Sequence, residues 1–414
     1  MATKLYDAIV STDSKMGDYL LPSAAFTAGM KSIYVRRGTY NEVANVIIPD
    51  GGSMTGETRN GVLLNFNGQA FGVRCNSLPS SIQTAGTISL TTNSTAVTGV
   101  GTNFNSLLPG DYISLGSIYM KISTITDNNN LTLTDTYKGV PVTGSSYMAL
   151  TMFSGMSIDN IQIANSSVTG LYVNGCRRFS LGAVSVYDCV PNIYIENSGN
   201  GEANQMVSEG STGVGMTVSN SFSVSCKTLE SLNSNSHGMA FIGNNVGMLV
   251  IDAECSNNGG SGIYINGSSS DGNFSKCALK SNASSGLYIN AGSSNIIIND
   301  SSISMNAGDG AVLNGDSIIF SGNIVNDNEY NGIVINGNNS IVSRCVSNNN
   351  VEGMNIAGNN NVISTNIAKN STTYGLHVMI GATDNIATYN NFTLAGYGTV
   401  QDEGTYTDLT GNKP

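Results

Sequence analysis

The sequence predicts an all-β protein, a right-handed single-stranded parallel β-helix with rungs of 21 to 24 residues and one inserted β-rich module. Of its 414 residues 40% are hydrophobic, only 11% are charged and 49 are glycine. The apolar residues occur in short β-branched bursts separated by Gly, Asn, Ser and Asp, which is typical of short strands and tight turns. A short pattern also recurs along most of the chain, which indicates a solenoid.

The recurring pattern is a glycine followed by an apolar, a variable and an apolar residue, often with asparagine next. Clear copies begin at Gly170, Gly262, Gly286, Gly310 and Gly332, and weaker copies begin at Asn192, Gly215, Gly238, Gly353 and Gly375. A unit of this length cannot bury its own apolar face, so the units must stack about 4.8 Å apart. The repeat therefore defines the rungs.

Positions within the repeat have distinct expected roles. The first and third residues after the marker glycine, such as Ile263 and Ile265, should point inward. The fourth position is asparagine at 174, 266, 290, 314 and 336, a column that can form a ladder of side-chain amide hydrogen bonds. Seven cysteines, none in a C-x-x-C pair, are expected to be free thiols packed as small apolar residues, with Cys277 and Cys345 at one turn position. We predict no metal and no other cofactor.

Four regions follow from these patterns. Residues 1–80 should form an N-terminal cap, with a short helix near Leu20–Phe26, and the first rungs. Residues 81–149 are rich in threonine and are expected to form an inserted small β-barrel or sandwich. Residues 150–395 form the main β-helix, and residues 396–414 should be a polar, irregular tail.

Two groups of phrases carry resemblances to known proteins. The phrase Ser32-Ile-Tyr-Val-Arg-Arg-Gly-Thr-Tyr-Asn41, followed by Val46-Ile-Ile-Pro-Asp-Gly-Gly52, resembles the first rungs of the pectate-lyase-like β-helix superfamily. With the repeat, this resemblance covers residues 20–395. The phrases Gly101-Thr-Asn-Phe104 and Leu107-Leu-Pro-Gly-Asp-Tyr-Ile113 resemble modules of bacteriophage and other viral tail and fibre proteins. The superfamily resemblance implies either chemistry on acidic polysaccharides or simple binding of them.

The charge balance limits the partners. A formal net charge of −11 argues against nucleic acid or an anionic membrane, because both require a basic face. The start of the chain does not have the pattern of a signal peptide, and no apolar run is long enough to span a bilayer. We therefore expect a soluble protein, made in a cytosol, without nucleic-acid or membrane partners.

Two pairs of carboxylates are candidate catalytic groups, although the catalytic phrases of the superfamily's hydrolases and epimerases are absent. Asp252 and Glu254 should share the outer face of one strand, about 7 Å apart, which suits an inverting glycosidase. The alternative is that Asp252 belongs to a column of alternating charge with Lys276 and Asp300 on the next rungs.

Asp309 and Glu352 are a second candidate pair, two rungs apart at about 9.6 Å. Both occupy the position before a marker glycine, as His237 does. For His237 itself we expect a solvated turn side chain.

A stripe of aromatic residues is the strongest functional signal. The second position after the marker should point outward, and it is tyrosine at Tyr172, Tyr194, Tyr264 and Tyr288. An outward stripe of this kind suggests a contact surface with identical subunits or a platform on which sugars stack. The alternative is burial against a loop of the same chain.

Three functions remain open. The first is a tailspike-like protein of the virion surface that binds host polysaccharide or decorates the particle. Such a protein would form a homo-oligomer such as a trimer and would have other virion proteins as partners. The second is a polysaccharide lyase or glycoside hydrolase, and the third is a purely structural particle component. All three share one fold, so the residues of the site must distinguish them.

Overall fold

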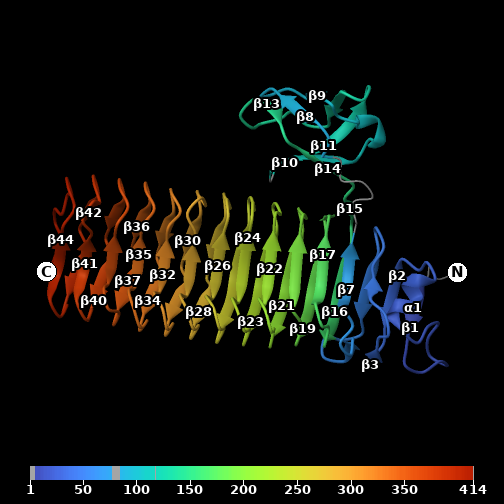
Figure 1. The fold of residues 1–414 in the computed structure, drawn as a ribbon. Coiled ribbons are helices and arrows are strands. Elements are labelled where there is room, and N and C mark those ends of the chain that lie inside the picture. The colour runs from blue at the N-terminus through green and yellow to red at the C-terminus, as the bar shows by residue number, and fades with distance from the viewer. Residues whose placement is uncertain (1–4, 77–83, 117, 414) are drawn as a thin grey trace.

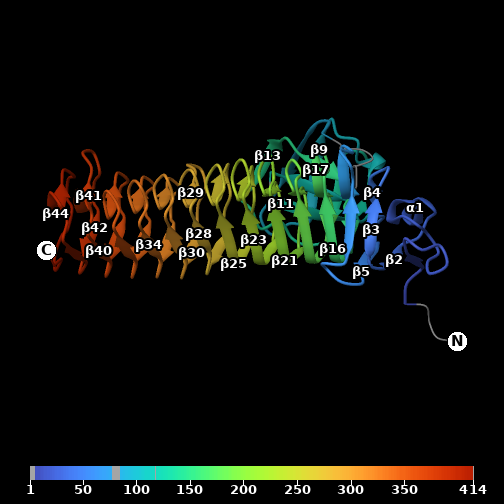
Figure 2. The same cartoon turned by 90° about the horizontal axis from the view of Figure 1, so that it is seen from below.

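The computed structural model describes residues 5–76, 84–116 and 118–413. The chain forms one long β-helix with its N-terminus at one end and its C-terminus at the other (Figure 1). A separate β module, cyan to green in Figure 1, stands over the N-terminal half of the β-helix, and Figure 2 shows the same module from below. The predicted all-β parallel β-helix is confirmed. Within the described residues, no helix is long and apolar enough to cross a membrane.

A 13-stranded parallel sheet contains the marker-glycine strands. Each strand pairs in register with its equivalent on the next rung, for example Tyr264 with Tyr288. The first and third residues after the marker point into the core as expected, since Ile263 and Ile265 are buried. The strands are β4 (Val46–Ile47), β7 (Phe71–Asn76), β17 (Thr169–Asn174), β20 (Ile193–Glu196), β22 (Met216–Ser219), β24 (Met239–Ile242), β26 (Ile263–Asn266), β29 (Leu287–Ile289), β32 (Ala311–Leu313), β35 (Ile333–Ile335), β38 (Met354–Ile356), β41 (Tyr374–Val378) and β44 (Gly398–Asp402).

A 22-stranded parallel sheet closes the rest of each rung. Five of its strands are eight residues long and continue through a bend, where one residue such as Asn160 (φ 58°) is left-handed. These are β16 (Ser157–Ala164), β19 (Ser180–Tyr187), β21 (Glu202–Glu209), β23 (Ser225–Leu232) and β25 (Leu249–Ser256).

In the other rungs two short strands lie on either side of the bend. Before the bend lie β1 (Ala8–Val10), β2 (Ser32–Val35), β5 (Ser53–Gly56), β27 (Asn273–Ser275), β30 (Ile297–Asn299), β33 (Ile319–Ser321), β36 (Ile341–Ser343), β39 (Val362–Ser364) and β42 (Ile386–Thr388). After it lie β3 (Gly38–Asn41), β6 (Val62–Asn65), β28 (Ala278–Lys280), β31 (Ser302–Ser304), β34 (Ile324–Asn326), β37 (Val346–Asn348), β40 (Ile367–Lys369) and β43 (Asn391–Thr393).

The marker position is glycine because the backbones of adjacent rungs approach closely there. A Cβ atom on Gly262 would lie 2.7 Å from the carbonyl oxygen of Gly286, and a Cβ on Gly286 would lie 2.9 Å from that of Gly310. The same relation joins Gly310 to Gly332 at 2.6 Å. The column of glycines is therefore a steric requirement of the stacking, not of turn conformation.

The longest asparagine ladder lies at a different turn from the asparagine column predicted from the sequence. Its amides are buried, and each Nδ2 donates to the Oδ1 of the next rung at 2.9–3.1 Å. Its members are Asn258, Asn282, Asn306, Asn328 and Asn350. In the column predicted from the sequence, the hydrogen bonds join Asn290 to Asn266 at 2.6 Å and Asn336 to Asn314 at 2.7 Å. That prediction was correct for these pairs, but the continuous buried ladder is elsewhere.

The cysteines behave as predicted. All seven are free and buried. The backbone N–H of Cys345 donates to Oδ1 of Asn366 at 2.8 Å, so cysteine and asparagine share one turn column.

The two ends of the β-helix differ, with a helix at the N-terminal end and a further rung at the C-terminal end. Helix α1 (Pro22–Thr27) covers the N-terminal end, and its Ala25 and Phe26 join the core, as expected for a cap. At the other end the expected irregular tail is wrong, since β44 adds a strand to the 13-stranded sheet. Val400 packs on the core there, and Asn412 extends an asparagine column by bonding Asn390 at 3.1 Å. These contacts order the segment despite its polar composition.

The inserted module is a seven-stranded antiparallel sheet with its own apolar core. It contacts the β-helix through Tyr119, whose ring stacks on Phe222 at 4.9 Å and whose hydroxyl donates to the carbonyl of Asn220. Its elements are β8 (Thr87–Leu90), β9 (Ala96–Val100), η1 (Phe104–Ser106), β10 (Tyr112–Leu115), β11 (Ile118–Ile125), β12 (Asn130–Leu133), β13 (Val142–Ser145) and β14 (Met148–Leu150). Two short strands, β15 (Phe153–Ser154) and β18 (Cys176–Arg177), pair beside it.

Candidate functional site

The outward side chains of the 13-stranded sheet form one continuous row, which we call the tyrosine face. Successive members pair in register from rung to rung, and the tyrosines and His377 are half-buried rather than fully solvated. The rings of Tyr172 and Tyr194 lie 5.6 Å apart, and those of Tyr264 and Tyr288 lie 5.4 Å apart. The face consists of Tyr172, Tyr194, Thr217, Ala240, Tyr264, Tyr288, Val312, Val334, Asn355 and His377.

The centre of the face is an aromatic stack. The imidazole of His237 lies parallel to the ring of Tyr264, with centroids 4.2 Å apart and an angle of 2° between the planes. Its Nδ1 accepts the backbone N–H of Ser261, and burial lowers the pKa of the histidine. The expectation of a solvated turn histidine is therefore wrong, because the residue before the marker glycine leans over the face.

The end of the face near the module holds a carboxylate between tyrosines. Glu196 accepts the hydroxyl of Tyr172 at 2.7 Å, and the hydroxyl of Tyr194 lies 3.4 Å from its other oxygen. Burial, followed by the hydrogen bond to Glu196, raises the pKa of Tyr172. Burial also raises the pKa of Tyr119 to about 12, with a further contribution from Glu196. The module thus borders this end of the face.

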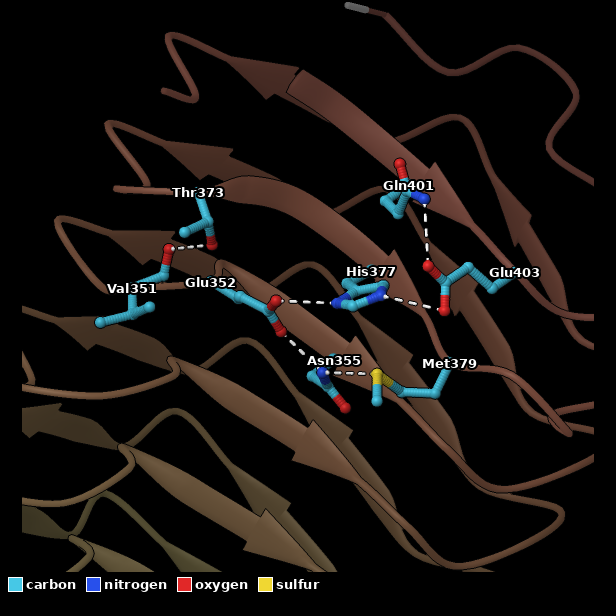
Figure 3. A network of polar contacts seen from close by, with 8 residues as sticks. All are labelled: Val351, Glu352, Asn355, Thr373, His377, Met379, Gln401 and Glu403. Carbon is cyan, nitrogen blue, oxygen red and sulfur yellow. Dashed lines mark hydrogen bonds and ion pairs between the residues drawn. The ribbon is translucent and has the colours of Figure 1, made fainter. Parts of the chain in front are cut away.

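The other end of the face holds a histidine between two carboxylates (Figure 3). Nδ1 of His377 lies 2.8 Å from Oε1 of Glu352, and Nε2 lies 4.0 Å from Oε2 of Glu403. The second oxygen of Glu352 accepts Nδ2 of Asn355 at 2.6 Å. Tyr374 completes the group, with its ring 5.2 Å from that of His377. These contacts fix the Glu352 side chain in one orientation.

Asp309 lies on the same side of the rungs as Glu352. Burial raises the pKa of Asp309, and the negative charge of Glu352 raises it further, while hydrogen bonds from Asn331 oppose both effects. The backbone N–H of Asn331 donates to Oδ1 of Asp309 at 2.9 Å. The two candidate carboxylates therefore interact electrostatically, and one of them has an environment that favours its protonated form.

Asp252 and Glu254 lie on the other sheet, away from the tyrosine face. Asp252 occupies the bend of β25 with φ 59°, so the straight strand we expected is wrong at this point. Both side chains are exposed, and Glu254 accepts the hydroxyl of Ser256 at 3.1 Å. The strand register places Asp252, Lys276 and Asp300 at successive bends. They form the column of alternating charge that was the alternative to a catalytic pair. A catalytic role for this pair stays a prediction.

The charges are distributed unevenly between the two sheets. Six lysines and arginines follow residue 178, and all lie in the strands or bends of the 22-stranded sheet or beside its last rung. They are Lys227, Lys276, Lys280, Arg344, Lys369 and Lys413. The tyrosine face from Tyr194 onward therefore contains neutral and acidic groups. Among the described residues there is no cluster of three or more His, Cys, Asp or Glu that could hold a metal ion.

Comparisons with known proteins confirm the fold. A family model described as "Right handed beta helix region" matches residues 207–358 and 239–393. No curated protein matches the sequence. The chain has the right-handed parallel β-helix fold, which it shares with solved structures of alginate epimerases and of a phage tailspike.

Solved structures with the same fold fall into two groups. The A-module of the mannuronan C-5 epimerase AlgE6 from Azotobacter vinelandii has a TM-score of 0.56 at 13% identity, covering 94% of this chain and 93% of that one. The tailspike gp49 of Pseudomonas phage LKA1 has a TM-score of 0.55 at 13% identity, covering 94% and 73%. The periplasmic alginate epimerase AlgG has a TM-score of 0.51 at 12% identity, and the match covers 63% of this chain and 78% of that one. At these identities the likeness is one of fold.

The tyrosines and Glu352 were predicted from the sequence, but the partners of Glu352 were not. His377 occupies the outward position after a marker glycine, and Glu352 occupies the position before one. These two repeat positions together could have indicated the contact between the two residues. Glu403 follows β44 in the segment expected to be irregular, and no repeat position pointed to it.

Proposed function

We propose that this chain is a tailspike-like protein of the virion surface that binds host-surface polysaccharide along the tyrosine face. The observation that carries the proposal is the row of His237, Tyr264 and Tyr288 rings at the centre of that face. Stacked, half-buried rings offer apolar area with polar edges, which suits the alternating apolar and hydroxyl surfaces of a sugar. A row running along the helix axis suits a polymer.

Two further observations support the proposal. The middle of the face is lined by neutral side chains, so a glycan there meets no strong charge. The tailspike of phage LKA1 shares the fold over most of this chain. Attachment to a particle beside other virion proteins, and assembly as a homo-oligomer such as a trimer, are further parts of the proposal.

Replacing Tyr264 and Tyr288 together by alanine is expected to weaken polysaccharide binding at least tenfold, because each substitution removes a stacking surface. A tenfold loss corresponds to about 1.4 kcal/mol. Binding to a panel of bacterial and algal polysaccharides is measured by calorimetry, with the oligomer mass recorded by light scattering. The matched control is Tyr389→Ala, an exposed tyrosine at a bend of the other sheet. Unchanged affinity, or a loss of oligomer mass in place of a loss of binding, contradicts the proposal.

A second candidate function is hydrolysis of the bound polysaccharide, favoured by the electrostatic coupling of Asp309 and Glu352. Asp309, whose pKa is raised, would protonate the glycosidic oxygen as it leaves. Glu352, held by His377 and Asn355, would take a proton from the attacking water. Their two-rung offset of about 9.6 Å leaves room for that water, as in inverting enzymes.

If the chain is a hydrolase, Asp309→Asn and Glu352→Gln are each expected to lower the rate of reducing-end release at least 100-fold. The rate should also fall as the pH rises through the raised pKa of Asp309, because the proton donor is lost. Retention of cleavage by both variants, with loss in Asp252→Asn or Glu254→Gln, would assign the chemistry to the other sheet. Binding without any product from a full panel would eliminate hydrolysis.

A further inference from the structure

A polar cleft of about 310 Å³ separates the inserted module from the β-helix. The module contributes Tyr112, Lys121 and Asp135 to its wall, and the end of β18 contributes Arg177 and the following Arg178. Three cations and one carboxylate thus surround one cavity in a chain whose net charge is −11. No other function described above uses these residues.

Arg177 is held in place by the module. Its guanidinium lies over the ring of Tyr112 at 4.9 Å and donates a hydrogen bond to the Tyr112 hydroxyl. With the Asn200 amide turned so that its oxygen faces the guanidinium, that oxygen lies 3.0 Å from Nε of Arg177. These contacts occupy Arg177 and hold one wall of the cleft.

Arg178 and Lys121 are the two cations that remain available. The backbone at Arg178 is fixed, because its N–H donates to the carbonyl of Gly199 at 3.0 Å and its φ is 58°. Neither side chain lies within 4.0 Å of a carboxylate in the part of the chain that the structure describes. Two unpaired cations facing one cavity, with only Asp135 to offset them, create a local site for an anion.

The cleft lies beside the tyrosine face. Arg177 follows Tyr172 in the same rung, and Lys121 lies two residues after Tyr119, whose hydroxyl donates to the carbonyl of Asn220 on the rung after that of Tyr194. The cleft and the end of the face that holds Tyr172 and Tyr194 therefore lie on the same or adjacent rungs. Beyond Tyr194 the face contains no lysine or arginine, so it offers no second cationic site.

We propose that this cleft binds an anionic substituent, a carboxylate or a sulfate ester, on a glycan whose backbone is otherwise neutral. The inference rests on the proposed glycan binding and adds the class of the ligand. Arg74 pairs in register with Tyr172, so the cations gather at the module end of the face, while the rest of the face is neutral and acidic. Isolated anionic groups at that end therefore fit the surface. A continuous polyuronate would place many carboxylates against Asp309, Glu352 and Glu403.

The test compares the intact chain with the double variant Lys121→Gln, Arg178→Gln. The calorimetric probes are a neutral oligosaccharide, the same oligosaccharide carrying one glucuronate, polygalacturonate and inorganic sulfate. We expect the glucuronate-bearing probe to bind at least tenfold more tightly than the neutral one, and this gain to disappear in the variant and at high salt. Lys276→Gln, Lys280→Gln serves as the control, with two cations removed from the other sheet, and circular dichroism confirms folding.

Several outcomes would overturn the inference. A gain from glucuronate that survives in the double variant places the anion elsewhere. If inorganic sulfate binds as tightly as the glucuronate-bearing probe, the cleft is a site for free anions. If polygalacturonate binds most tightly of all the probes, the ligand is not a neutral glycan with isolated anionic substituents. The proposed function fails separately, since it predicts that Tyr264→Ala, Tyr288→Ala weakens even the neutral probe.

Discussion

Replacing Asn306 by alanine is expected to lower the free energy of unfolding by about 3–4 kcal/mol. Oδ1 of Asn306 accepts both the backbone N–H and the side-chain Nδ2 of Asn282, at 3.0 and 2.9 Å. Its own Nδ2 donates to the carbonyl of Leu279 at 3.1 Å and to Oδ1 of Asn328 at 2.9 Å. Alanine makes none of these bonds, and the site is fully buried, so water cannot replace them.

The measurement is the midpoint and slope of urea unfolding followed by circular dichroism. The matched control is Asn336→Ala, which removes the amide of a partly exposed pair with Asn314, where water can replace the lost bond. We expect less than about 1 kcal/mol there. Equal effects of the two substitutions would show that the buried ladder does not stabilise the β-helix more than a surface pair.

The fold could be predicted from the sequence because every rung of the solenoid repeats the same local structure. Inward apolar residues such as Ile263 and Ile265 and the glycine before them recur at a nearly constant period, and each copy supports the interpretation of the next. The C-terminal segment was misread because its composition is polar, whereas the stacking of β44 on β41 and the amide of Asn412 order it. Contacts with the preceding rung outweighed local composition.

The site was only partly predictable for a geometric reason. The alternation of the strand shows that Tyr264 points outward, but it does not show that His237, in the preceding turn, leans onto the same surface. Likewise the outward position of His377 was visible, while its contact with Glu352 depends on the shape of the turn. Residues in regular strands were placed from the sequence, and the turn residues that face them required the structure.

The sequence contains a periodic pattern of asparagines that could have predicted the buried ladder. Asn258, Asn282 and Asn306 recur at the period of the repeat, as do the two members that follow. They lie in Asn- and Ser-rich turns, where asparagine is common, so composition alone did not distinguish them from surface residues. Their burial and their bonds to backbone N–H groups distinguish them in the structure.

Replacing Gly310 by alanine is expected to destabilise the β-helix by about 3 kcal/mol, because the added methyl group has no space. Its Cβ would lie 2.2 Å from Cγ1 of Val325 and 2.6 Å from the carbonyl oxygen of Gly332. Val325 is buried in the core, and the Gly332 carbonyl accepts the N–H of Ala311 at 2.9 Å. Relieving the overlap therefore requires two adjacent rungs to separate, at the cost of hydrogen bonds between them.

Gly398→Ala provides the comparison within the same sheet. A Cβ at this position meets only the ring of Tyr374, at 3.8 Å, which is an ordinary van der Waals contact. We expect its urea midpoint to stay within the range of a surface substitution, about 0.5 kcal/mol. A small effect at Gly310 would mean that adjacent rungs can move apart without cost, and the steric explanation of the marker glycine would then be wrong.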